Sequence, residues 1–300
     1  MSYSRTLTES ETVSQGKSMM RTGVFFHEIF AKHSWPVMGS KFKNFPQAMA
    51  AELKLEGVRL YVPEKVSEEL LLKVHTPRFV EDVKRAWYYE GAALSVGGCV
   101  KAAELVYFGE LDNALVFDVA AGHHASPDHA WGGTYISCTG PAVVNLRERT
   151  GKRLRFAIID TDSHHGDGTR NVFLGDRDVL HVCFCSSSKI EDESTKIDVD
   201  VGWKTTDEEY LRKVEREFVP RVKEFKPDLI FHILGHDTCQ GDYGDRGLTK
   251  DFFPKLVALV KACAQEVCGG KYVVITHGGA RADIAEYIFP RIIRVLHEDS

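Results

Sequence analysis

The sequence lacks the features of several common functional classes. Its 300 residues contain no apolar run of about 18 residues, so no membrane-spanning helix is expected. It also has no basic excess: 43 acidic residues against 38 basic ones give a formal net charge of −5. Proteins that bind nucleic acid or anionic membranes usually carry the opposite balance, so we expect neither partner. The N-terminus has no apolar segment of the signal-peptide type.

Cysteine is present, but not in the spacing of a zinc finger or a disulfide framework. The chain has 7 cysteines and no Cys-x-x-Cys pair. Some of them stand inside apolar runs, as Cys183 and Cys185 do. This usage is typical of reduced core thiols, and it predicts a cytoplasmic protein.

Composition and length predict one globular domain. Hydrophobic residues make up 43% of the chain and charged residues 27%, which is ordinary for a folded protein. A single α/β domain of 300 residues is common. We expect a flexible lead-in over residues 1–20 and one domain over 21–300.

Short apolar runs alternate with longer helical patterns along the chain. The expected strands are residues 22–27, 57–62, 113–119, 155–162, 179–184, 228–234 and 271–276. The expected helices include residues 67–75, 91–109, 207–225 and 253–267. Strands that are apolar on both faces and separated by helices indicate a three-layer αβα fold with a parallel sheet. The polar segment 186–202 is interpreted as a surface loop without a chemical role.

Asp, His and Gly crowd the ends of four of these runs. The segments concerned are residues 120–133, 160–168, 235–245 and 277–283. Ligands of open parallel sheets bind outside the carboxyl ends of the strands, so the functional site is expected there.

Three of these residues suit a divalent metal. Asp162 and His164 lie two positions apart, and in an extended segment such residues share a face. Asp237, after the run 228–234, is the natural third ligand. Two carboxylates and an imidazole suit Zn²⁺ or Fe²⁺ and leave a position open for water and substrate. Each aspartate alone is also compatible with capping a helix.

Two adjacent imidazoles, His123 and His124, suit acid–base chemistry on the attacking water. They need carboxylate partners that fix the tautomer of each ring. Asp160 and Asp167, from the neighbouring strand end, are the candidates.

These motifs resemble those of the histone deacetylase superfamily, which includes acetylpolyamine amidohydrolases and has the arginase/deacetylase α/β fold. The resemblance rests on GHHA (122–125), DTDSHHGDG (160–168) and the GxDT of 235–238. Weaker similarity extends over residues 75–84 and 91–98. The resemblance implies that residues 21–300 form a catalytic domain of this type.

The resemblance also implies roles for the motif residues. Asp162, His164 and Asp237 are then zinc ligands, and a structural K⁺ is expected at the backbone beside them. His124 is implied as general base and then acid, and His123 as its electrostatic partner. The corresponding reaction is hydrolysis of an amide to a carboxylate and an amine.

In the same way, Asp160 is implied to hold His123, and Asp167 to hold His124. The implied substrate is a small-molecule or peptide acyl-amine.

The chain departs from the family pattern at three positions expected to touch substrate. Arg281 stands where the family has a carbonyl-polarising Tyr, and Gly133 where a Phe walls the channel. His236 precedes the third metal ligand, at a position where a small or apolar residue is expected. Ordinary acetyl-lysine specificity is therefore not predicted.

Two interpretations of Arg281 remain open. It either donates to an oxyanion or substrate carboxylate, or forms a surface pair with Asp283 or Asp242. His236 and Tyr243 are other candidate donors.

The leading hypothesis is a zinc-dependent amidohydrolase acting on an acylated amine. The alternative is a catalytically weak homologue that binds ligands or partners, which the missing Tyr favours. An arginase-like enzyme with two manganese ions is disfavoured, because GHHA and the single-metal ligand set fit the deacetylase branch better.

Overall fold

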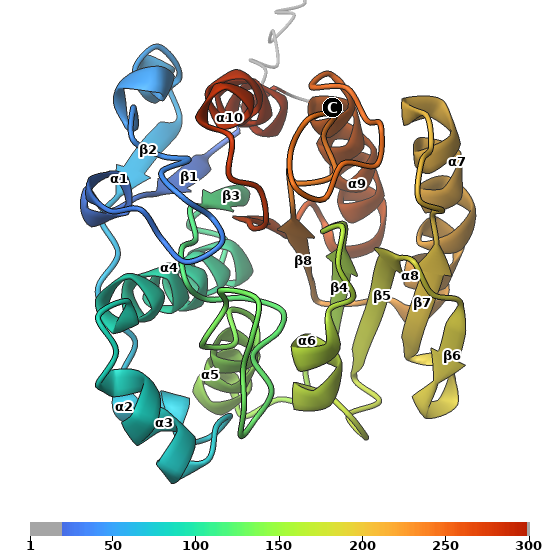
Figure 1. Ribbon diagram of the computed structural model, residues 1–300. Helices are drawn as coiled ribbons and strands as arrows, with labels where there is room; N and C mark the ends of the chain where they lie inside the picture. The colour runs from blue at the N-terminus through green and yellow to red at the C-terminus, as the bar shows by residue number, and fades with distance from the viewer. Residues whose placement is uncertain (1–19, 299–300) are drawn as a thin grey trace, which may run out of the picture.

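A nine-stranded sheet forms the centre of the protein (Figure 1). The computed structural model describes residues 20–298, so the lead-in predicted for 1–20 lies almost wholly outside the described residues. The strand order is β2-β1-β3-β9-β8-β4-β5-β7-β6, and every neighbouring pair is parallel except β6 with β7. The predicted three-layer α/β class is confirmed.

The strands are β1 (Thr22–Phe25), β2 (Val58–Tyr61), β3 (Asn113–Val116), β4 (Phe156–Asp160), β5 (Val179–Cys185), β6 (Lys189–Glu191), β7 (Lys196–Asp200), β8 (Leu229–Leu234) and β9 (Tyr272–Thr276). The helices are α1 (Ile29–Lys32), α2 (Glu68–Leu71), α3 (Pro77–Lys84), α4 (Tyr89–Tyr107), α5 (Gly140–Thr150), α6 (Asp167–Val172), α7 (Asp207–Glu217), α8 (Val219–Phe225), α9 (Phe252–Cys268) and α10 (Ala282–His297). Short 3₁₀ turns are η1 (Gln47–Met49), η2 (Glu52–Lys54) and η3 (Asp192–Ser194).

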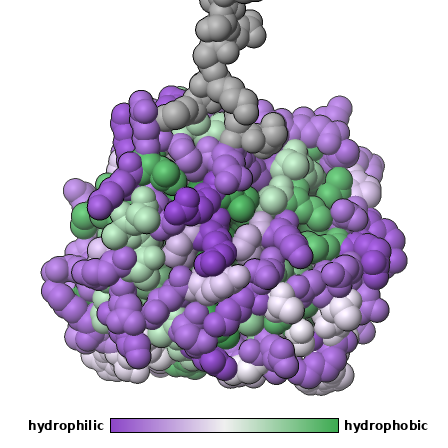
Figure 2. Space-filling view, turned by 90° about the horizontal axis from the view of Figure 1, so that it is seen from above, coloured by the Kyte–Doolittle hydropathy of each residue, from purple (hydrophilic) through white to green (hydrophobic). Residues whose placement is uncertain are grey.

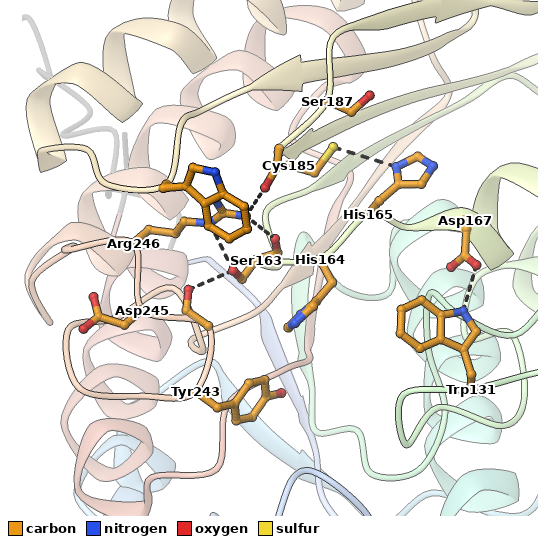
Figure 3. A pocket seen from close by; sticks show the side chains of 13 residues that line it. Trp131, Ser163, His164, His165, Asp167, Cys185, Ser187, Tyr243, Asp245 and Arg246 are labelled. Carbon is orange, nitrogen blue, oxygen red and sulfur yellow. Dashed lines mark hydrogen bonds between the residues drawn. The ribbon is translucent and has the colours of Figure 1, made fainter.

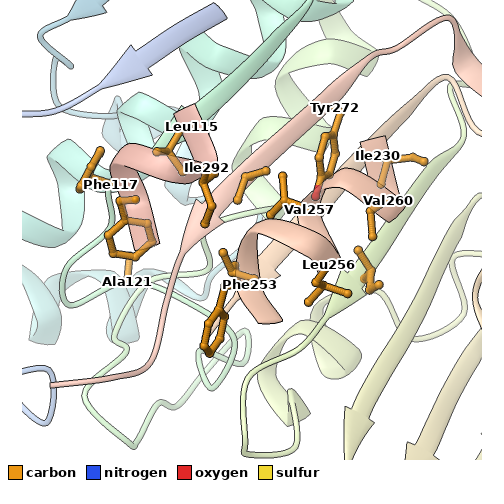
Figure 4. Packing of buried hydrophobic residues seen from close by; sticks show 14 of the residues in the cluster. Leu115, Phe117, Ala121, Ile230, Phe253, Leu256, Val257, Val260, Tyr272 and Ile292 are labelled. Atoms are coloured by element: carbon orange, nitrogen blue, oxygen red, sulfur yellow. The ribbon is translucent and has the colours of Figure 1, made fainter. Parts of the chain in front are cut away.

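Alternate residues of the central strands feed two cores. On β9, Tyr272 and Val274 belong to the core under α9 and α10, whereas Val273 and Ile275 face the core under α4 and α5. Figure 4 shows part of the first core, with α9 residues such as Leu256 against the sheet. Burial on both faces explains why these strands are continuous apolar runs.

The interpretation of residues 186–202 as a loop was wrong. The segment contains β6 and β7, and β7 pairs with β5. Two of its charged residues, Lys196 and Asp198, point inward and find partners there, so charge alone did not indicate a loop. Lys196 is buried and donates to the carbonyl of Val179 at 2.8 Å, and Asp198 is buried against Arg170.

Hydrophilic residues dominate the face shown in Figure 2, and hydrophobic ones form only small groups there. Among residues 20–298 no helix is both long and apolar enough to span a membrane. All seven cysteines are free and buried.

The register aligns the carboxyl ends of the central strands. Asp160 at the end of β4 pairs with Ile233 of β8, and Leu234 pairs with Thr276 of β9. Polar loops that follow β3, β4, β8 and β9 therefore begin at one edge of the sheet, where the candidate site lies.

Candidate active site

The three predicted metal ligands converge on one point. His164 Nδ1 lies 3.0 Å from Asp162 Oδ1 and 3.1 Å from Asp237 Oδ2. Both carboxylates are buried, and His164 is half-exposed at the edge of a cavity. Glycine is required beside them, because a Cβ at Gly278 would stand 2.2 Å from Asp162 Oδ2.

The surroundings of Asp237 do not fully balance its negative charge. Burial, and then the nearby Asp162 carboxylate, raise the pKa of Asp237 to about 7. Asp237 Oδ2 is buried and accepts no hydrogen bond from the described residues. Such an oxygen, with a second carboxylate and an imidazole beside it, fits a divalent cation such as Zn²⁺ or Fe²⁺.

The histidine pair is held as two His–Asp dyads. His123 Nδ1 lies 2.8 Å from Asp160 Oδ2, and His124 Nδ1 lies 2.6 Å from Asp167 Oδ1. The Nε2 atoms of the two rings are 3.1 Å apart. The structure therefore brings these four residues together as the sequence predicts. Both imidazoles line the same cavity as Asp162 and His164.

The two rings differ in their affinity for protons. Burial acts to lower the pKa of His123, but the carboxylates of Asp160 and Asp162 outweigh it and raise that pKa to about 9. Burial and then the charge of His123 lower the pKa of His124. Near neutral pH, His123 is thus the cation and His124 the neutral base, which is the separation that acid–base chemistry requires.

Trp131 completes the surroundings of His124. Its ring centroid lies 3.8 Å from that of His124, and its Nε1–H donates to Asp167 Oδ2 at 2.8 Å. Figure 3 shows this bond at the cavity wall. Trp131 also lines both cavities of the site.

Tyr243 brings a hydroxyl to the metal ligands from the loop after β8. The backbone N–H of Gly279 donates to that hydroxyl at 2.8 Å, which leaves the phenolic proton free. A Cβ at Gly278 would lie 3.0 Å from the hydroxyl and 3.0 Å from Asp237 Cγ. Burial, and then the negative charge of Asp237, raise the pKa of Tyr243, so the hydroxyl keeps its proton.

Arg281 lies elsewhere. Its Nε and Nη2 donate to the two carboxylate oxygens of Asp283 at 2.9 and 3.0 Å, and half of its side chain is exposed. It lines neither cavity described below. The structure therefore favours the surface-pair alternative over substrate binding, because a carboxylate two residues away offers a bidentate partner.

His236 and Gly133 also differ from the substrate-binding role expected of them. The His236 ring is fully buried, stands edge-on to Phe289 at 5.7 Å, and lines neither cavity. A Cβ at Gly133 would lie 2.6 Å from the carbonyl oxygen of Pro36. That contact brings in the neighbouring segment, whose Val37 and Met38 wall the cavity instead of a Phe.

His277 is a site residue that the sequence did not assign. Its Nε2 accepts the backbone N–H of His123 at 3.0 Å, and its Nδ1 lies 3.1 Å from Asp162 Oδ2. The backbone N–H of Gly278 also donates to Nδ1 at 2.8 Å, so contacts with His123, Gly278 and Asp162 fix the ring. His277 therefore orients a metal ligand. Its position directly after a strand was the one available signal.

Two adjoining cavities open above these groups. The inner one, of about 220 Å³, contains the histidines and metal ligands Asp162 and His164. The outer one, of about 570 Å³, is the pocket in Figure 3. Trp131, His164 and Tyr243 line both and form the boundary between them.

Comparisons with known proteins identify relatives of this chain. A family model described as the histone deacetylase domain matches residues 85–296. A probable deacetylase of Archaeoglobus fulgidus is 29% identical over 297 residues, covering 87% of this chain and 81% of the relative. A histone deacetylase-like amidohydrolase of Pseudomonas aeruginosa is 30% identical over 243 residues, covering 71% and 64%.

Longer relatives match over part of their length. Histone deacetylase HDA1 of Saccharomyces cerevisiae is 30% identical over 241 residues, which cover 73% of this chain but 33% of the yeast protein. The crystal structure of the HDA15 HD domain superimposes with a TM-score of 0.80 at 20% identity, covering 92% of this chain and 89% of that one. Because the family match extends over most of the chain, the protein belongs to the histone deacetylase family.

Proposed function

We propose that the protein is a zinc-dependent amidohydrolase that cleaves an acylated amine by attack of water on the amide carbonyl. The observation that carries this proposal is the meeting of the Asp162, His164 and Asp237 ligand atoms with two His–Asp dyads. Both imidazoles of the dyads, with Asp162 and His164, line the inner cavity. A metal set without the dyads would have no base, and the dyads alone would have no electrophile.

Asp162, His164 and Asp237 are the residues that hold the ion. Bound zinc supplies a Lewis acid for the carbonyl and lowers the pKa of water to about 7. Iron(II) suits the same ligands.

His124 acts as the base. Asp167 holds its Nδ1–H at 2.6 Å, so the lone pair of the neutral ring is on Nε2. This nitrogen lies 3.1 Å from His123 Nε2 and is the one that takes the proton of the attacking water. The same nitrogen then returns that proton to the leaving amine. His123, kept cationic by Asp160, places positive charge beside the oxygen that becomes negative.

Tyr243 supplies the donor that Arg281 does not. Its protonated hydroxyl lies at the inner cavity, its oxygen is anchored by Gly279, and its proton has no acceptor among residues 20–298. A carbonyl oxygen bound there receives that proton as a hydrogen bond. We infer that the role of the usual Tyr after the last strand has moved to the loop after β8.

The cavities suggest the kind of substrate. The inner space of about 220 Å³ suits a small acyl group, and the outer one of about 570 Å³ suits the amine portion. Because Gly133 stands where a Phe is expected in the channel wall, we assume no preference for acetyl-lysine. The proposed substrate class is a small-molecule or peptide acyl-amine. The similarity to a probable deacetylase and to a histone deacetylase-like amidohydrolase supports this reaction class.

The test is carboxylate release by the zinc-loaded protein from acetyl-lysine peptides, acetylated polyamines and acidic acyl amides. We expect release that a chelator abolishes and that Asp237→Asn lacks. Metal binding without release from any amide would support the alternative of a weakly catalytic, ligand-binding homologue.

A further inference from the structure

A second set of metal-ligating side chains lies beside the first. His165, Cys183, Cys185 and Asp198 place one donor atom each within 4.8 Å of all the others. Figure 3 shows His165 and Cys185 facing each other at the wall of the outer cavity. None of the four belongs to the catalytic metal set.

The fold holds these residues on rigid strands. Cys183 and Cys185 are two positions apart on β5, so their side chains share a face. Asp198 of β7 is the direct register partner of Cys183. His165 follows the catalytic ligand His164 by one residue and therefore points to the opposite side, toward β5 and β7.

The donor separations match a coordination sphere. Cys185 Sγ lies 3.8 Å from His165 Nδ1, and His165 Nδ1 lies 3.3 Å from Asp198 Oδ1. Tetrahedral zinc, with bonds of about 2.0 to 2.3 Å, spaces its ligand atoms by roughly 3.3 to 3.8 Å. We propose that this cluster, which we call the Cys–His–Asp site, binds a second, thiophilic divalent ion of the zinc class.

Charge and neighbouring groups are consistent with such an ion. Two thiolates and one carboxylate carry three negative charges, against two on the ion and one on Arg170. Arg170 is buried and bonds both oxygens of Asp198, with one bond of 3.1 Å, as expected of a group that orients a ligating carboxylate. The interaction between the two thiols lowers the pKa of Cys185 to about 6 and raises that of Cys183, so Cys185 is the first thiolate and the ion displaces the proton of Cys183.

Solvent reaches the cluster from the outer cavity, which both His165 and Cys185 line. His165 is partly exposed in the lining of the outer cavity, whereas Cys183 and Asp198 are buried. An ion therefore has an entry path without any movement of the sheet.

Thiolate ligation gives the two metal sets different spectra, which provides the test. The catalytic set contains no sulfur, so thiolate-to-metal charge-transfer absorption on titration with Cd²⁺ or Co²⁺ reports only the Cys–His–Asp site. We expect two equivalents of metal on the wild-type protein, one of them with this absorption. Cys185→Ser and His165→Ala are expected to weaken or remove that absorption and to lose one equivalent.

Two controls separate this site from the proposed active site and from other thiols. Asp237→Asn is expected to lose amide hydrolysis and to keep the charge-transfer absorption. Cys263→Ser, on α9, removes a thiol outside the cluster and is expected to keep both. Circular dichroism verifies folding of each variant, and Asp198→Asn replaces any that fails to fold.

The proposal is overturned if the folded wild-type protein binds one equivalent without charge-transfer absorption. The pairs of Asp198 with His165 and Arg170 would then be a metal-free ion network. Absorption that survives both Cys185→Ser and His165→Ala would likewise overturn it, because the metal would be on other thiols. Loss of hydrolysis alone bears on the proposed function and not on this site.

Discussion

Replacing Tyr243 by Phe tests the catalytic arrangement with the loss of a single oxygen. The ring remains beside His164, at a centroid distance of 5.9 Å, so the cavity keeps its shape. The hydroxyl accepts one bond from Gly279 at 2.8 Å, and its loss costs about 1 kcal/mol of stability. The fold should therefore survive, and any kinetic effect is assignable to the missing donor.

The expected kinetic effect is much larger than the effect on stability. Removing one oxyanion donor lowers kcat by about 10²- to 10³-fold, or roughly 2.7–4 kcal/mol of transition-state stabilisation. Because the proton of Tyr243 is used only when charge develops on the carbonyl, KM should change little. Steady-state kinetics measures both constants on whichever amide named under Proposed function is hydrolysed fastest. Metal content is checked in parallel.

Arg281→Ala is the matched control. Arg281 is paired with Asp283 outside the cavities, so its removal should leave turnover near the wild-type value. Unchanged kcat in Tyr243→Phe would refute the reasoning. A large loss of kcat in Arg281→Ala with no loss in Tyr243→Phe would assign the donor role to Arg281, in the loop after β9.

Further predictions concern the dyad, the pH dependence of stability and the metal. Trp131→Phe keeps the ring on His124 but removes the 2.8 Å bond to Asp167, so kcat should fall about tenfold, as stopped-assay kinetics can measure. Burial lowers the pKa of His75 to about 4. As the pH falls from about 6.5 to 4, the imidazole binds a proton in the unfolded chain but not in the folded one. The free energy of unfolding should therefore decrease as the pH falls through this range. Urea titrations at several pH values should show a smaller slope for His75→Gln, and an equal slope would contradict this. Asp162→Asn should lower zinc affinity by at least about tenfold in a competition assay, because it removes a charged ligand.

The fold and the core of the site follow from local regularities. Each apolar run buried on both faces formed a strand, and the α/β class follows from their alternation with helices. The two-residue spacing of a strand predicted that Asp162 and His164 converge. In the structure β4 ends at Asp160, and both residues converge from the bend that follows it. Because ligands of open parallel sheets bind at the carboxyl ends of the strands, the sequence also predicts that Asp237, His123 and His124 lie beside this pair.

Tertiary structure decided where the loop side chains point. The sequence order offered Arg281 for the missing Tyr, yet Asp283 holds it outside while Tyr243 reaches in from another loop. No local rule gives such a direction, because it depends on the conformation of two loops and on what packs between them. Gly133 shows the same dependence, since the wall it lacks comes from Val37, far away in the chain.

Strand β7 shows most clearly what the sequence alone does not predict. Its lysine and aspartate resemble loop residues until the partners are known, and those partners come from distant segments. Asp198 meets Arg170, His165 and Cys185 only because β7 adds to the sheet beside β5. Periodicity therefore determined the strands. Contacts between distant segments determined which buried charged side chains have partners. A charged side chain is stable in the protein interior only where the tertiary structure places an opposite charge or a hydrogen-bonding group beside it.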